Sequence, residues 1–263
     1  MVEPNDLKEI LYNISKKIIV PSFGNLTSNQ ISYKNEKDIV TEIDLAVELE
    51  LSISLPKLIK NANFIGEEIY AKNPSILKYY LSDNFCWTVD PIDGTSNFAK
   101  SKDRFAVMVA LTKNKKIIQS FIYKPLTEEF MYADNKATFL DNKKIKLNKN
   151  TEIENSIGSI STKYWDEAKK TKLLAIKDSF RNINSYGSIG CEYFDIALGK
   201  RDFALLSRLH PWDHIPGVFI VRQAGGHDCH FNKKEYKFYE DSKNLVVSNS
   251  QKLSNEILNL IGE

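Results

Sequence analysis

The sequence predicts a mixed α/β protein with an α+β N-terminal lobe and an α/β C-terminal lobe. Helical patterns followed by strand-like runs and tight turns fill residues 1–150. Strands and helices alternate over residues 151–263, and we place the lobe boundary near Asn150. A chain of 263 residues that is 42% hydrophobic can bury a sizeable core, so a globular protein is expected.

Two helices are expected near the start of the chain. Apolar residues recur at helical spacing from Leu7 to Ile18, after a cap at residues 5–6. The polar residues 22–37 are expected to form a loop. Thr41 and Asp44 resemble a capping box, which predicts that a second helix begins there.

The rest of the N-terminal lobe is predicted to form an antiparallel sheet. We expect the second helix to end at about Leu55, because Pro56 disturbs it. Turn residues at 113–115 and 141–142 separate strand-like runs. The predicted strands cover residues 63–65, 85–89, 105–112, 116–123 and 129–132.

Alternating strand and helix signals fill the C-terminal lobe, which is typical of an α/β architecture. The segment Gly187-Ser188-Ile189-Gly190 is expected to open a helix. The other predicted helices cover residues 165–178, 213–223 and 253–261, and the predicted strands cover residues 156–161, 203–206 and 245–248.

Charge and cysteine content narrow the functional classes. The formal net charge of +2 creates no global basic field, so nucleic acid is not expected to be the main ligand. No stretch is long and apolar enough to span a bilayer, so we expect no membrane partner. Three widely spaced cysteines favour reduced thiols and a cytoplasmic protein: Cys86, Cys191 and Cys229.

The stretch with the clearest chemistry follows the strand at residues 85–89. Asp90 and Asp93 lie at the end of this strand, which we expect to break at Pro91 because proline cannot donate to a sheet ladder. Their carboxylates and the carbonyl of Ile92 are hard oxygen ligands that suit Mg²⁺. An Asp-Gly pair is also a common turn signal, so this stretch needs support from the rest of the chain.

The residues that follow suit an anion. Gly94 lets the backbone approach a ligand closely, and the amides of Gly94, Thr95 and Ser96 can open a helix whose N-terminus faces an anion. Two more acids lie at junctions between predicted elements, Glu67 after a strand and Asp213 at the head of a helix. Carboxylates, a metal ion and backbone amides together predict a phosphate site.

At this point the sequence resembles the inositol monophosphatase family of Mg²⁺-dependent, lithium-sensitive phosphatases. The matching motifs occur in the family's order and together span most of the chain. They lie at residues 38–44, 64–68, 87–98 and 212–213, followed by Gly217 and residues 224–226. The resemblance implies a five-layer αβαβα sandwich, usually a homodimer, with the site between the lobes.

The resemblance also implies the metal ligands. Glu67, Asp90 and the carbonyl of Ile92 match the ligands of one metal ion. Asp90, Asp93 and Asp213 match the ligands of a second ion, so Asp90 would bridge the two. Two or three Mg²⁺ ions would then be held in each active site, where Glu67 would take part in catalysis.

Further roles follow from the same resemblance. Asp44 and Thr95 match the pair that orients the attacking water, and the amides of Gly94, Thr95 and Ser96 match the phosphate-binding turn. The alternative for Asp44 and Thr95 is helix capping alone. The substrate would also contact Asp213 and the loop Gly187-Ser188-Ile189.

One departure from the family concerns the substrate. In inositol-specific relatives an acid seven positions before the aspartate of the Trp-Asp pair binds a ring hydroxyl, and here that position is Leu206. Leucine cannot accept a hydrogen bond. Arg208, two residues on, could instead bind a carboxylate or a second phosphate of the substrate.

We therefore predict a Mg²⁺-dependent phosphatase that hydrolyses a small phosphorylated metabolite by direct attack of a metal-activated water. The candidate substrates are inositol 1-phosphate, a sugar bisphosphate, histidinol phosphate and 3′-phosphoadenosine 5′-phosphate. The alternative from another class is a non-catalytic partner in RNA-synthesis complexes, like the bacterial extragenic suppressor protein. Acids at all four ligand positions favour catalysis.

Overall fold

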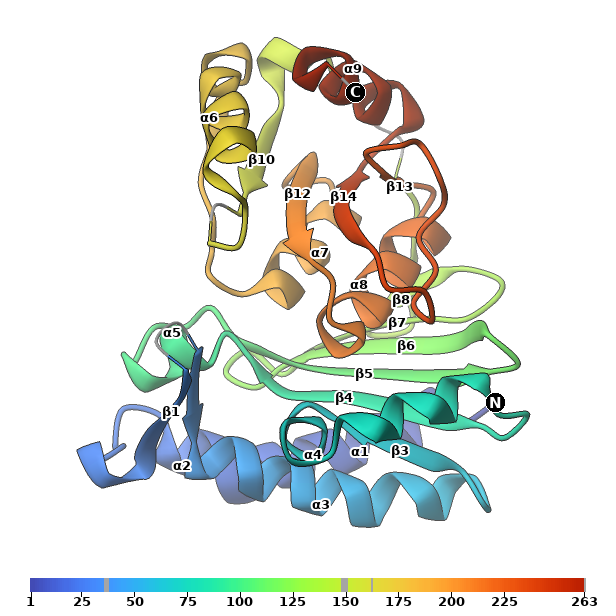
Figure 1. Cartoon of the computed structure of the whole chain (residues 1–263). Coiled ribbons are helices and arrows are strands. Elements are labelled where there is room, and N and C mark those ends of the chain that lie inside the picture. Colours follow the sequence, from blue (N-terminus) through green and yellow to red (C-terminus); the bar gives the residue numbers. More distant parts are fainter. Residues whose placement is uncertain (36–37, 148–150, 162, 263) are drawn as a thin grey trace.

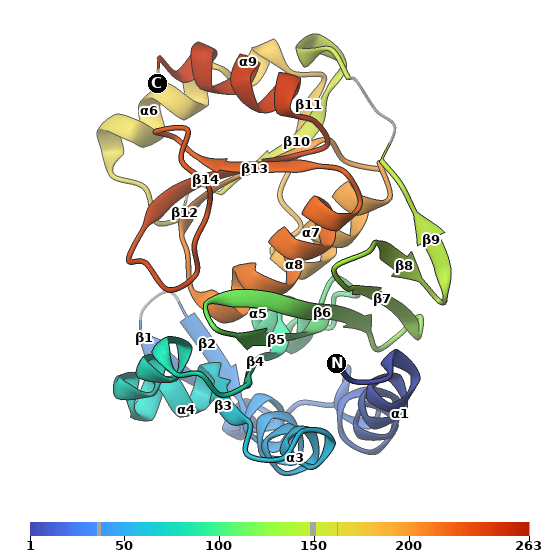
Figure 2. The ribbon, with the colours of Figure 1, turned by 90° about the vertical axis from the view of Figure 1, so that its right-hand side faces the viewer.

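A computed structural model of the chain describes residues 1–35, 38–147, 151–161 and 163–262. Its elements stack in five layers in which helices and sheets alternate (Figures 1 and 2). The predicted fold class and the αβαβα sandwich are therefore confirmed. The predicted lobe boundary near Asn150 falls at residues 148–150, which lie outside the described residues.

The larger sheet has seven strands in the order β3-β4-β5-β6-β7-β8-β9. β3 runs parallel to β4, so the prediction of an antiparallel sheet was wrong at this edge, where α4 (Glu67–Lys72) and a 3-10 helix (Pro74–Leu81) provide the crossover. The later neighbours are all antiparallel. The strands are β3 (Asn63–Gly66), β4 (Cys86–Asp93), β5 (Ala106–Lys113), β6 (Lys116–Lys124), β7 (Glu129–Ala133), β8 (Thr138–Leu140) and β9 (Lys143–Ile145).

Both faces of this sheet are covered, and the side-chain alternation of β5 shows how. Val107 and Val109 pack into the apolar cluster beneath the sheet, with helices α1 (Pro4–Ile14) and α3 (Glu42–Leu58). Met108 and Ala110 point the other way, into the cluster formed with α7 (Ile189–Ala197) and α8 (Pro211–Gln223). Because alternate residues face opposite layers, the strand is apolar at every position from Ala106 to Leu111 rather than at every second position.

The first helix begins before the predicted cap at residues 5–6. Pro4 occupies its first turn, and the N-cap residue Glu3 makes no side-chain capping bond. Proline suits this position because its fixed φ is helical and its missing N–H would have no partner there. The chain continues through a π-helical turn (Ser15–Ile19) into α2 (Val20–Ser22).

The predicted loop at residues 22–37 was wrong in part. It contains a 3-10 turn (Ser28–Gln30) and β1 (Ile31–Asn35), which pairs antiparallel with β2 (Asp38–Thr41). The polar sequence of β1 carries no buried face, so periodicity could not reveal it. The capping box of Thr41 and Asp44 is confirmed at the start of α3.

Helix α3 runs to Leu58, beyond the predicted end at Leu55. Pro56 lies inside its last turn. A proline there removes one hydrogen bond close to the end of the helix, where few bonds remain to be lost, and the helix continues.

The smaller sheet has the order β11-β10-β12-β14-β13. β10 runs parallel to β11 and β12, whereas β14 is antiparallel to β12 and β13. The two-residue β11 is too short to give a sequence signal. The strands are β10 (Ile157–Ile160), β11 (Asn182–Ile183), β12 (Phe203–Arg208), β13 (His227–His230) and β14 (Lys243–Ser248).

Helices α7 (Ile189–Ala197) and α8 (Pro211–Gln223) fill the layer between the two sheets, and α6 (Glu167–Ala175) and α9 (Gln251–Ile261) cover the outer face (Figure 2). The predicted helix at residues 165–178 was too long. Asp166 caps α6 by accepting a bond from the amide of Lys169, and a separate 3-10 turn (Lys177–Ser179) follows.

Two compositional predictions can be compared with the structure. All three cysteines are buried free thiols, as the wide spacing predicted. Within the described ranges, no helix is both long and apolar enough to cross a membrane.

Candidate active site

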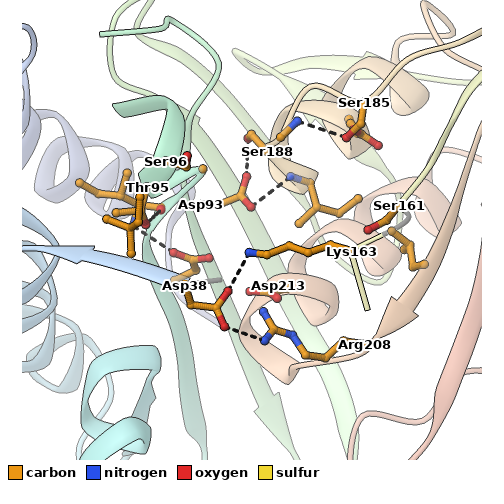
Figure 3. Close-up of a pocket in the computed structure, with 18 of the residues that line it drawn as sticks. Asp38, Asp93, Thr95, Ser96, Ser161, Lys163, Ser185, Ser188, Arg208 and Asp213 are labelled. Atoms are coloured by element: carbon orange, nitrogen blue, oxygen red, sulfur yellow. Dashed lines mark hydrogen bonds and ion pairs between the residues drawn. The ribbon is translucent and has the colours of Figure 1, made fainter. Parts of the chain in front are cut away.

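A cavity of about 250 Å³ lies between the larger sheet and the C-terminal lobe, and both lobes line it. The N-terminal half contributes Glu67, Asp90 and Thr95, and the C-terminal half contributes Ser188 and Asp213. Figure 3 shows labelled side chains from both halves pointing toward one another. Every residue that the sequence singled out for ligand binding, from Glu67 to Asp213, therefore lies in one cavity wall or beside it.

Strand β4 does not break at Pro91, in contrast to the prediction. It continues to Asp93, with a register shift against β5 between Asp90 and Asp93. Pro91 lies within this bulge, where the ladder does not need its missing N–H, and pairing with β3 has already ended at Val89. The bulge turns the carboxylates of Asp90 and Asp93 toward different partners.

Three carboxylates from distant elements converge at the cavity. Glu67 begins α4 (Glu67–Lys72), Asp90 lies on β4, and Asp213 lies in the first turn of α8. One oxygen of each lies within 4.8 Å of the others. Burial, together with the neighbouring negative charges, raises the pKa of Asp90 and of Asp213 well above the usual range of a carboxyl. Only hard oxygen donors meet here, and a divalent cation would relieve their repulsion.

Glu48 fixes the start of α4, and sequence reasoning missed it. Its two carboxylate oxygens accept bonds from the amides of Glu68 (2.8 Å) and Ile69 (2.7 Å). Burial raises the pKa of Glu48 to about 7. Gly66 is required beside it, because a Cβ there would lie 2.2 Å from the Glu48 carboxyl carbon. The available signal was an acid on the buried face of α3, one turn after Asp44.

Lys34 also reaches the carboxylate cluster from β1. Its ammonium donates to Glu67 at 2.7 Å and to Glu68 at 2.6 Å. Burial lowers the pKa of Lys34, but the two carboxylates raise it by more, so the net shift is upward and the group stays charged. No sequence signal marked this lysine, because β1 itself was not predicted.

Asp44 and Thr95 are in contact, and Asp44 also caps α3. One Asp44 oxygen accepts from the Thr41 amide at 2.9 Å, and the other lies 3.0 Å from the Thr95 hydroxyl. That hydroxyl also lies 3.0 Å from the carbonyl of Ile92. Burial raises the pKa of Asp44 to about 6. Capping and contact with Thr95 therefore coexist on one side chain.

Asp93 faces the C-terminal lobe and is not one of the three clustered carboxylates. It accepts bonds from the Ser188 hydroxyl, from the Ile189 amide at 3.1 Å and from the Gly190 amide at 2.7 Å. Ser188 also caps α7 by accepting from the Cys191 amide at 3.2 Å. Burial raises the pKa of Asp93 to about 6, and these three bonds act against that rise. Asp93 thus joins the end of β4 to the loop that opens α7.

The turn after β4 needs glycine. Gly94 has φ of +91°, and a Cβ there would lie 2.9 Å from the Arg104 carbonyl. Thr95 and Ser96 begin the short helix α5 (Thr95–Ala99) and line the cavity. The Asn97 side chain, which the sequence did not single out, donates to the carbonyls of Arg104 (2.7 Å) and Tyr186 (2.8 Å) and so holds this turn against the C-terminal lobe.

The wall formed by β12 is apolar at one position and cationic at another. Leu206 is buried and offers no polar atom to the cavity. Arg208 donates to Asp38 at 3.1 Å, and Lys163 donates to the other Asp38 oxygen at 2.9 Å. Tyr164 donates to the same carboxylate. Arg208 was expected at this wall, whereas Lys163 and Tyr164 carried no sequence signal.

Comparisons with known proteins agree with this geometry. The model of the inositol monophosphatase family matches residues 7–263. The chain belongs to this family. A fructose-1,6-bisphosphatase/inositol-1-monophosphatase of Thermotoga maritima is 30% identical over 229 residues, which cover 86% of this chain and 84% of that protein. The named relatives of this inositol monophosphatase family member are phosphomonoester hydrolases, and the chain is an enzyme of that class.

Solved structures give the same answer for the fold of this family member. An IMPase of Thermotoga maritima superposes with a TM-score of 0.83 at 25% identity, covering 97% of this chain and 95% of that one. An extragenic suppressor protein of Bartonella henselae has a TM-score of 0.85 at 21% identity, with 98% of each chain covered. At 21% identity, the similarity to the Bartonella henselae protein shows a shared fold alone. Phosphatases of this family generally depend on Mg²⁺, and the acidic cluster is compatible with that dependence.

Proposed function

We propose that this phosphatase hydrolyses the phosphomonoester of a small phosphorylated metabolite with Mg²⁺ and a directly attacking water. The observation that carries the proposal is the convergence of Glu67, Asp90 and Asp213 from separate elements into one cavity. Thr95 lines the same cavity, and its hydroxyl already donates a hydrogen bond to the buried carboxylate of Asp44. A purely structural acidic cluster would not need such a neighbouring pair.

The donor set suits magnesium. We propose that Glu67, Asp90 and the Ile92 carbonyl hold one ion and that Asp90, Asp93 and Asp213 hold a second, with two or three ions per site. The bound ions would supply Lewis acidity to the phosphate oxygens and lower the pKa of a coordinated water. Each Asp93 oxygen accepts at least one hydrogen bond from the chain, and carboxylate oxygens have further lone pairs for a cation.

The chain's own residues would position the reactants. Asp44 accepts a hydrogen bond from the Thr95 hydroxyl. The Thr95 oxygen would then have a lone pair free to accept a bond from the attacking water and to aim that water at phosphorus. The amides of Gly94, Thr95 and Ser96 would hold the phosphate oxygens. Glu67 would take part through the ion it binds.

The rest of the substrate would meet the C-terminal wall. We propose that Gly187, Ser188, Ile189 and Arg208 bind the leaving group, next to Asp213. Inositol 1-phosphate, a sugar bisphosphate, histidinol phosphate and 3′-phosphoadenosine 5′-phosphate remain the candidate substrates. Leu206 disfavours a specific contact to an inositol hydroxyl at its position.

We further propose a lithium-sensitive cytoplasmic homodimer, with residues 1–150 carrying most metal ligands and residues 151–263 supplying Asp213 and the substrate pocket. The non-catalytic alternative, a partner in RNA-synthesis complexes, draws on the fold that the chain shares with an extragenic suppressor protein. The formal net charge of +2 and the assembled acidic cluster favour catalysis over that role.

A phosphate-release assay on the candidate substrates, with Mg²⁺ and then with added Li⁺, tests the proposal. Asp90→Asn is expected to lower kcat/KM by about 10²-fold or more, the scale of losing one electrostatic contact to the transition state. Asp83→Asn, at an exposed position, makes the same charge change as a control and should retain activity. If Asp90→Asn hydrolysed its best substrate as well as the wild type does, the metal mechanism would be wrong.

A further inference from the structure

Three donors from the C-terminal lobe converge on one carboxylate across the cavity. The ammonium of Lys163, the hydroxyl of Tyr164 and the guanidinium of Arg208 all bond to Asp38, and we call these three residues the distal cradle. Figure 3 shows the bonds from Lys163 and Arg208 to Asp38. All four side chains line the same cavity as the clustered acids. Asp38 therefore shows where this wall already binds an anionic group.

The cradle is preorganised for anion recognition. The Arg208 guanidinium carbon lies over the Tyr164 ring, 3.8 Å from its centre, and this contact restrains the guanidinium. A planar fork matches the two oxygens of a carboxylate or phosphate, and Lys163 adds a second cationic donor. Such an arrangement favours an anion over a sugar hydroxyl.

The cradle residue Arg208 lies close to Leu206 along β12. Leu206 and Arg208 are two residues apart on β12, so they face the same side of the sheet, and both line the cavity. A leaving group that enters along this wall would meet an apolar side chain and then the cationic one. Tyr164 and Arg208 also line a second cavity of about 730 Å³, so there is room for an extended metabolite past the cradle.

From this arrangement we infer that the substrate carries a second anionic group, a phosphate or a carboxylate, on its leaving alcohol, and that this group replaces Asp38 on the distal cradle. The inference rests on the proposed phosphatase function and narrows its substrate class to doubly anionic metabolites. Asp38 acts as an internal competitor that satisfies the cradle when no substrate is bound. Phosphate and carboxylate share this recognition chemistry, so the experiment must separate them.

Two matched pairs of substrates distinguish a distal phosphate from a distal carboxylate. Fructose 1,6-bisphosphate and fructose 1-phosphate differ by a distal phosphate, and 2-phosphoglycerate and glycerol 2-phosphate differ by a carboxylate. The ratio of kcat/KM within each pair reports recognition of the second group alone. We expect the wild type to prefer the doubly anionic member of at least one pair, and the pair that shows the preference identifies the group.

Variants of the cradle should change that ratio. Arg208→Gln is expected to reduce it by about 10- to 100-fold, the scale of charge-assisted hydrogen bonds, and Arg208→Lys by less because the charge is kept and the fork is lost. Asp38→Asn should raise the ratio, because the internal competitor is weakened. Lys100→Gln removes a positive charge at an exposed position outside the cavity lining and should leave the ratio unchanged.

A binding measurement adds a readout that does not depend on turnover. Calorimetry should show that fructose 6-phosphate, or glycerate if the carboxylate pair is preferred, binds Arg208→Gln more weakly than wild type by a similar factor. Equal ratios in wild type and Arg208→Gln for both pairs would overturn the inference while leaving the phosphatase function intact. Absence of phosphate release from every substrate, with wild-type protein and Mg²⁺, would overturn the function and the inference together.

Discussion

Leu206 is the single side chain through which we expect this site to select its substrate. It is buried in the cavity wall, two residues before Arg208 on the same strand. A leucine there can exclude water and contact carbon atoms, but it leaves a substrate hydroxyl without a partner. An unpaired buried hydroxyl costs about 1–3 kcal/mol, which is enough to disfavour a polyol substrate at this position.

Leu206→Glu is therefore expected to shift selectivity toward inositol 1-phosphate. A carboxylate at position 206 can accept a bond from a ring hydroxyl, so the kcat/KM for inositol 1-phosphate relative to fructose 1,6-bisphosphate should rise by about 10-fold or more. Leu206→Met keeps the volume without adding an acceptor and serves as the control. No change in this ratio for Leu206→Glu would remove Leu206 from the specificity argument.

At the scale of elements, the junction between β3 and α4 places a proposed metal ligand. The Glu48 carboxylate from α3 occupies the space beside Gly66 and bonds to the first free amides of α4. Glu67 begins that helix, so its orientation depends on a contact between two elements. Glycine is needed here because of a close approach rather than because of a special φ angle.

Gly66→Ala should destabilise the fold by about 1–3 kcal/mol, since the added methyl overlaps the Glu48 carboxylate and the neighbours must move. Mg²⁺ affinity should fall as well, because Glu67 moves with α4. Urea denaturation and calorimetric Mg²⁺ titration provide the two measurements.

A double-mutant cycle tests the cause of that effect. Gly66→Ala combined with Glu48→Ala should cost less than the sum of the single changes, since the second substitution removes the overlapping group. Strict additivity would show that the proposed clash is not the source of the loss.

At the scale of the whole molecule, the buried acids link stability to pH. Six carboxyls have a raised pKa mainly because of burial: Asp44, Glu48, Glu68, Asp90, Asp93 and Asp213. Each binds a proton more tightly in the folded chain than in the unfolded one. Between the ordinary value near 4 and the folded values of about 6 to 7, the folded state therefore holds more protons, and its stability falls as pH rises.

The buried histidines, which are fewer than these carboxyls, change the stability with pH in the opposite direction. Burial lowers the pKa of three of them, so they favour folding less as pH falls: His210, His214 and His227. The six carboxyls outnumber them, and we expect the carboxyls to set the sign for the metal-free protein.

Mg²⁺ should counteract the loss of stability that the buried carboxyls cause as pH rises. Cations bind the ionised carboxylates of the folded state, so the stabilisation by Mg²⁺ should be larger at about pH 7.5 than at about pH 5. Saturation at 100 times Kd would add about 2.7 kcal/mol. Thermal denaturation with Mg²⁺ and with a chelator at both pH values measures the increment, and Asp90→Asn should reduce it. An increment that does not depend on pH would contradict the cluster as the binding site.

Much of the fold follows from local patterning. The capping box at Thr41, the turn at residues 113–115 and the helix at residues 253–261 all lie where periodicity and capping chemistry placed them, apart from small shifts at their ends. Strand β1 and the passage of β4 through Pro91 escaped prediction. Their hydrogen bonds come from partner strands, and neighbouring residues do not encode which partner will be present.

For the candidate site, the sequence by itself determined which chemical groups are present at these positions: acids at positions 67, 90 and 213, and the Asp and Thr at positions 44 and 95. Only the tertiary structure decided that three of these acids meet within 4.8 Å, that Glu48 and Lys34 surround them, and that the distal cradle holds Asp38. The type of residue at each position is a local property of the sequence. The distance between residues remote in sequence depends instead on how two sheets pack across a shared layer of helices.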